Sequence, residues 1–70
     1  IIVNYSMYLD VLNYIIETYE DTIDRLIHTG FGRETEFGTI VTEKLVQNVT
    51  DRMIQLKVRR IHLLTNSTPN

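Results

Sequence analysis

The sequence predicts an all-α fold: an antiparallel two-helix hairpin, two copies of which are expected to pair into a four-helix bundle. Two long runs, residues 1–26 and 39–64, repeat their apolar residues at helical spacing. All three glycines fall between these runs, in the segment GFGRETEFG of residues 30–38. Because this connection is short, the helices are expected to lie antiparallel. The predicted domain spans residues 1–65, and the polar residues 66–70 are expected to form a disordered tail.

The run over residues 1–26 has the apolar stripe of a helix in a bundle. The members of the stripe are spaced three and four apart: Ile2, Tyr5, Leu9, Leu12, Ile16, Tyr19, Ile23 and Leu26. Three further residues widen it beyond a coiled-coil seam: Ile1, Tyr8 and Ile15. Ser6 is a candidate N-cap. The helix is expected to end at Thr29-Gly30, because glycine suits the left-handed cap position.

The run over residues 39–64 is apolar on two faces of one helix, which is expected to begin between Thr35 and Thr39. One face consists of Val41, Leu45, Val49, Met53, Leu56 and Leu63. The other consists of Ile40, Ile54, Val58 and Ile61. A surface helix needs only one apolar face. The second face is therefore predicted to be an oligomer interface, most simply that of a two-fold dimer.

The small size of the chain also favours an oligomer. Ordering a residue costs about 1.5 kcal/mol, and apolar burial returns about 25 cal/mol per Å². A single hairpin has one shared interface, and a chain without cysteine has no disulfide to stabilise it. Association between copies is the remaining source of burial.

A basic cluster lies near the end of the second run: Arg52, Lys57, Arg59, Arg60 and His62. A turn near residue 32 would place this cluster beside residues 1–5, which have no acidic side chain. One interpretation is a docking patch for phosphate, nucleic acid or an acidic partner. The other is that the cations complement the helix dipole, keep the helix end soluble or pair across a subunit boundary. Nucleic acid is not favoured, since the net charge is −2 and no exposed aromatics alternate with the cations.

No motif of the sequence points to catalysis, a cofactor or a metal. Cysteine is absent, the serines have no histidine at a recognisable spacing, and Gly30-Phe31-Gly32 lacks the Lys-Ser/Thr of a phosphate-binding loop. One helical face of the first run carries carboxylates and an imidazole: Glu17, Glu20, Asp21, Asp24 and His28. These residues lie opposite the apolar stripe, so a solvated acidic face is expected rather than a metal site. Tyr14 is also expected to be exposed there.

Signals for localisation are few. No run approaches the roughly 20 apolar residues of a membrane span. Absence of cysteine favours an intracellular setting, whereas three Asn-x-Ser/Thr matches, at Asn4, Asn48 and Asn66, leave a secreted or viral surface protein as the alternative. The chain begins at Ile1 without Met, as expected of a piece of a longer protein.

The sequence thus predicts a non-enzymatic oligomerisation or protein-interaction module that self-associates through the second helix. Its expected partner is a second copy of the chain, with another protein as a further option. The alternative is a nucleic-acid or phosphate-binding accessory domain that uses the basic cluster.

Overall fold

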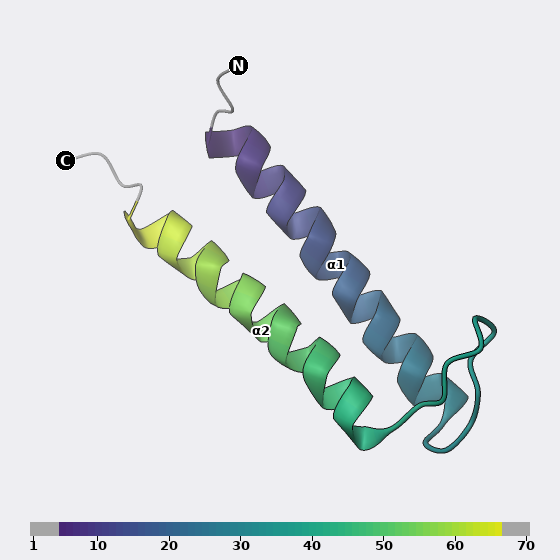
Figure 1. The fold of residues 1–70 in the computed structure, drawn as a ribbon. Helices are drawn as coiled ribbons and strands as arrows, with labels where there is room; N and C mark the ends of the chain where they lie inside the picture. The colour runs from purple at the N-terminus through teal and green to yellow at the C-terminus, as the bar shows by residue number, and fades with distance from the viewer. Residues whose placement is uncertain (1–4, 67–70) are drawn as a thin grey trace.

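The computed structural model describes residues 5–66, which form two helices joined by an irregular connection. Helix α1 (Tyr5–Thr29) and helix α2 (Glu43–Asn66) run antiparallel and side by side, and α1 begins at the same end of the hairpin where α2 ends (Figure 1). The molecule is elongated, with extents of 51 × 21 × 16 Å. The predicted all-α hairpin is therefore confirmed, whereas pairing into a four-helix bundle stays a prediction.

Helix α1 buries most of the stripe that the sequence predicts, but Tyr5, Tyr8 and Ile15 are exposed. Leu12, Ile16 and Leu26 are buried, and Leu9, Tyr19 and Ile23 are half-buried. The helix ends as expected, because Gly30 adopts a φ of +96° and its N–H donates to the Leu26 carbonyl at 3.0 Å. Ser6 as an N-cap is wrong: it lies inside the helix, which already includes Tyr5. Ile1, Ile2, Asn4 and the tail from residue 67 lie outside the described residues.

The connection over residues 30–42 folds back on itself like a small β-hairpin. Glu34 and Ile40 form an isolated antiparallel bridge. Two backbone hydrogen bonds join Val41 to Gly32 and Arg33, at 2.8 and 2.9 Å. These hydrogen bonds pair the two arms of the connection with each other.

The beginning of α2 differs from the sequence prediction. Thr42 caps the helix: its hydroxyl oxygen accepts from the Leu45 N–H at 3.0 Å. The prediction of a start between Thr35 and Thr39 is wrong, since the Thr35 hydroxyl accepts instead from the Thr39 and Phe37 N–H groups within the connection. The run Thr39–Thr42 consists of β-branched residues, which favour extended backbone.

Helix α2 packs on α1 through its predicted inner face. Leu45, Val49, Met53, Leu56 and Leu63 are all half-buried. Val41 is 1% exposed and belongs to the core as expected, but it reaches the core from the connection, not from a helix. Ile40 is likewise not on α2, and it is 51% exposed. Its placement on one helical face with Ile54, Val58 and Ile61 is therefore wrong.

The lateral contacts between the helices show where the turn is centred. The Tyr5 hydroxyl donates to the Leu63 carbonyl at 3.1 Å, and the Arg60 guanidinium donates to the Asn13 amide oxygen at 2.8 Å. These pairs require a turn centred well after residue 32, because the connection extends to Thr42. Residues 57–60 consequently lie beside residues 8–20 of α1, not beside residues 1–5.

Candidate interaction surfaces

The α2 apolar face, defined as Ile54, Val58 and Ile61, is exposed along the C-terminal half of the helix. Their exposed fractions are 45%, 39% and 59%. Because α1 contacts the opposite side of α2, nothing in the described hairpin covers this face. Ile40, the fourth predicted interface residue, lies at the other end of the molecule. The expected role of all four in an oligomer stays a prediction.

The predicted basic cluster has partners within the chain, contrary to expectation. Lys57 forms an ion pair with Glu20, with 3.4 Å between Nζ and Oε2. Arg59 donates to the Tyr8 hydroxyl at 3.3 Å. Together with the Arg60–Asn13 hydrogen bond, these contacts bind three members of the cluster to α1. The expectation failed because it placed the turn too early in the chain.

These contacts divide the surface of the hairpin into two sides. The acidic side carries the Lys57–Glu20 ion pair, and Glu17 and Asp24 lie on it because they are one helical turn from Glu20 in each direction. The basic side carries the Arg59–Tyr8 hydrogen bond. Arg52 lies on it, two helical turns before Arg59. The five predicted basic residues therefore do not form one patch.

An open groove of about 860 Å³ runs along α2 on the basic side. Three members of the predicted cluster line it, and they are Arg52, Arg59 and His62. Tyr19, Leu56 and Leu63 form apolar parts of its wall. The groove therefore combines cations and one carboxylate, that of Asp51, with apolar surface.

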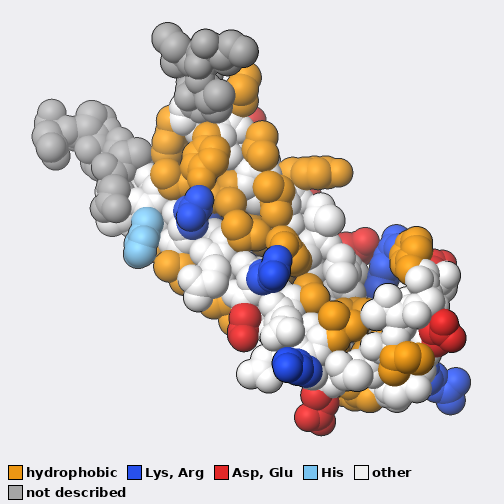
Figure 2. Space-filling view, in the orientation of Figure 1, with side chains coloured by type: hydrophobic (Ala, Val, Ile, Leu, Met, Phe, Trp, Pro, Cys, Tyr) orange, Lys and Arg blue, Asp and Glu red, His pale blue; other side chains and the backbone are white. Residues whose placement is uncertain are grey.

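The α1 apolar face, defined as Val11 and Ile15, is a second exposed face that the sequence analysis missed. Val11 is 51% exposed and Ile15 is 37% exposed, with Met7 one turn earlier at 52%. Figure 2 shows hydrophobic side chains gathered over the end of the hairpin where α1 begins, with Lys or Arg side chains beside them. The spacing of four between Met7, Val11 and Ile15 was the available signal. The sequence analysis assigned Ile15 to the core stripe and did not assign Val11.

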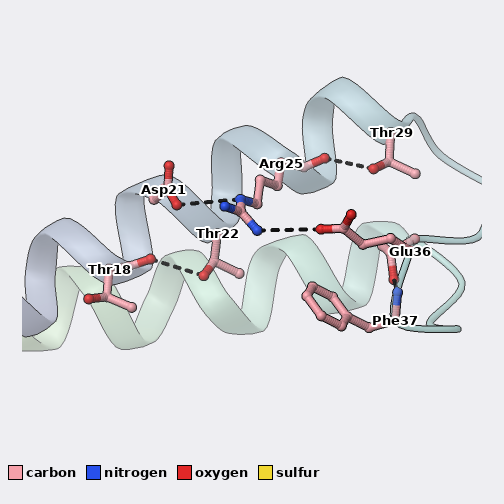
Figure 3. A network of polar contacts seen from close by, with 8 residues as sticks. Thr18, Asp21, Thr22, Arg25, Thr29, Glu36 and Phe37 are labelled. Atoms are coloured by element: carbon pink, nitrogen blue, oxygen red, sulfur yellow. Dashed lines mark hydrogen bonds and ion pairs between the residues drawn. The ribbon is translucent and has the colours of Figure 1, made fainter.

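At the other end of the molecule, Arg25 links α1 to the connection. Its guanidinium forms ion pairs with Asp21 at 3.4 Å and Glu36 at 3.5 Å (Figure 3). An open groove of about 920 Å³ lies here, and Phe37 on its rim is 79% exposed. These ion pairs are solvent-exposed, so they position the connection and add little to stability.

Chemically reactive arrangements are sparse in the described part of the chain. Residues 5–66 contain no group of three His, Cys, Asp or Glu side chains that could hold a metal ion. Several threonine hydroxyls donate to the carbonyl four residues earlier in their own helix: Thr18, Thr22, Thr29 and Thr65. Across the same residues, no helix is both long and apolar enough to span a membrane.

The fold and these surfaces define a class, an all-α helical hairpin with exposed apolar faces. Comparison with family models, curated proteins and solved structures finds no match to this chain.

Proposed function

We propose that this chain is a non-enzymatic self-association module in which the α2 apolar face contacts another copy. The observation that carries the proposal is the exposure of Ile54, Val58 and Ile61 after α1 has covered the other side of α2. Three adjacent aliphatic side chains on one helical face are typical of a contact between helices. The absence of cysteine favours an intracellular setting for this association.

The small core of the hairpin supports the same proposal. Within residues 5–65, the buried hydrophobic side chains are Leu12, Ile16, Leu26 and Val41. Each large aliphatic side chain left in water forgoes about 1.5–3 kcal/mol. Since domains are stable by only about 5–15 kcal/mol, the exposed face forgoes a substantial share of the available stabilisation. Contact with a second copy would recover it.

Sedimentation equilibrium tests the proposal. The wild-type chain should form an oligomer, and its melting temperature should rise with protein concentration because folding and association are linked. The double variant Ile54→Lys/Ile61→Lys should lose the oligomer. The matched control is Phe31→Lys/Phe37→Lys, which places two lysines at exposed apolar positions of the connection, outside both apolar faces and the basic side. A wild-type chain that stays monomeric and melts independently of concentration would overturn the proposal.

The groove on the basic side supports a second candidate function, the binding of phosphate or nucleic acid. Arg52, Arg59 and His62 line this groove. Lys57 and Arg60 instead contact Glu20 and Asn13 of α1. Binding of this kind weakens steeply with salt. An oligonucleotide titration should therefore lose affinity in Arg52→Glu/Arg59→Glu, and an equal affinity in this variant would exclude the groove.

A further inference from the structure

Ile54 and Ile61 of the α2 apolar face lie on the opposite side of the hairpin from the α1 apolar face, and Val58 between them also lines the groove on the basic side. Ile54 and Ile61 are one helical turn from Lys57 in each direction, so they lie on the acidic side with the Lys57–Glu20 ion pair. Val11 and Ile15 follow Tyr8 by three and seven residues. They therefore lie on the basic side, where Arg59 donates to Tyr8.

On each side, a charged row on one helix lies beside the apolar face of the other helix. On the acidic side, α1 carries Glu17, Glu20 and Asp24 next to the α2 apolar face. On the basic side, α2 carries Arg52 and Arg59 next to the α1 apolar face, and one carboxylate, Asp51, lines the same groove as these two arginines. Each side thus has one apolar half and one charged half, and the two charged halves have opposite sign.

This distribution discriminates between two ways of joining copies. Two acidic sides can meet about a two-fold axis, with the α2 apolar faces packed together and the two α2 helices antiparallel. This arrangement also brings the two α1 acidic rows toward each other. A contact between the acidic side of one copy and the basic side of the next avoids this. When α1 of one copy lies over α2 of the other, apolar face meets apolar face and the arginine row meets the carboxylate row.

Both apolar faces also lie in the same half of the hairpin, the half that holds the two chain ends. The Tyr8–Arg59 and Asn13–Arg60 hydrogen bonds place residues 8–13 of α1 beside residues 59–60 of α2. The C-terminal part of the α2 apolar face is therefore level with the α1 apolar face, whereas the Lys57–Glu20 ion pair shows that Ile54 lies nearer the connection. Two copies can match these faces while the remainder of each hairpin extends in opposite directions.

We propose that the chain associates head to tail, with the α2 apolar face of one copy packed on the α1 apolar face of the next. This inference rests on the self-association proposed above and specifies which surfaces meet. A head-to-tail contact leaves one face of each kind open at the ends of the assembly. The assembly therefore grows beyond a dimer as protein concentration rises.

Mixing two face-blocked variants tests this inference. Ile54→Lys/Ile61→Lys blocks the α2 apolar face, and Val11→Lys/Ile15→Lys blocks the α1 apolar face. Each variant alone should remain monomeric where the wild-type chain assembles, with association at least about tenfold weaker. An equimolar mixture should form a one-to-one heterodimer that does not grow, because each variant retains the face that the other lacks.

Controls separate failure of this inference from failure of self-association. Circular dichroism of each variant must give the wild-type helical signal, and the single substitutions Val11→Lys and Ile61→Lys replace the double variants if it does not. If the Val11→Lys variants assemble like the wild type, or if the mixture contains only monomers, the head-to-tail contact is wrong although self-association stands. If the wild-type chain is itself monomeric, both proposals fail.

Discussion

At the scale of single residues, burial separates side chains that the helical period places on different faces of α1. Leu12 is 3% exposed and Tyr14 is 71% exposed, although they are two residues apart. Leu12→Ala should therefore lower the free energy of unfolding by about 2–5 kcal/mol, the usual effect of truncating a buried leucine. Tyr14→Ala should change it by about 0.5 kcal/mol or less. Urea denaturation of both variants checks this, and the reverse ranking would show that the faces are misassigned.

At the scale of elements, the N-terminal cap of α2 gives a second prediction. The Thr42 hydroxyl accepts from the Leu45 N–H, one of the amides that a helix start otherwise leaves without a partner. Thr42→Ala should lower the free energy of unfolding by about 1 kcal/mol. Thr39→Ala is the matched control, since Thr39 is an exposed threonine of the connection that caps no helix. Equal losses of stability for the two variants in thermal melts would show that Thr42 does not cap α2.

The same element shows how far the sequence predicts the fold. Both helices and the end of α1 at Gly30 follow from local patterns, namely apolar period and glycine position. The beginning of α2 does not, because threonines at 35, 39 and 42 are all suitable caps and Val41 fits a helical face as well as an extended segment. Hydrogen bonds between the two arms of the connection decide among these options, and they depend on residues far from the helix start.

At the scale of the whole molecule, the candidate surfaces depend on how the two helices are aligned. The length of the connection sets this alignment, and the sequence did not predict that length. The exposed α2 apolar face is visible in the sequence because it depends on one helix. The partners of Lys57, Arg59 and Arg60 depend on the alignment of two helices, and a connection that ends at Thr42 shifts this alignment. The division into an acidic and a basic side therefore emerges only when both helices are placed together.

That division predicts how the assembly responds to salt. A head-to-tail contact sets the row of Arg52 and Arg59 against the row of Glu17 and Asp24, whereas a two-fold contact between acidic sides gains no such attraction. Raising the ionic strength from about 0.01 M to about 1 M shortens the Debye length from about 30 Å to about 3 Å. Sedimentation equilibrium should then show weaker association at high salt. The neutralised variant Arg52→Gln/Arg59→Gln should associate weakly at both salt concentrations, and this isolates the arginines as the source of the response. Association that strengthens with salt would indicate a contact dominated by apolar burial and like charges, which is the two-fold arrangement.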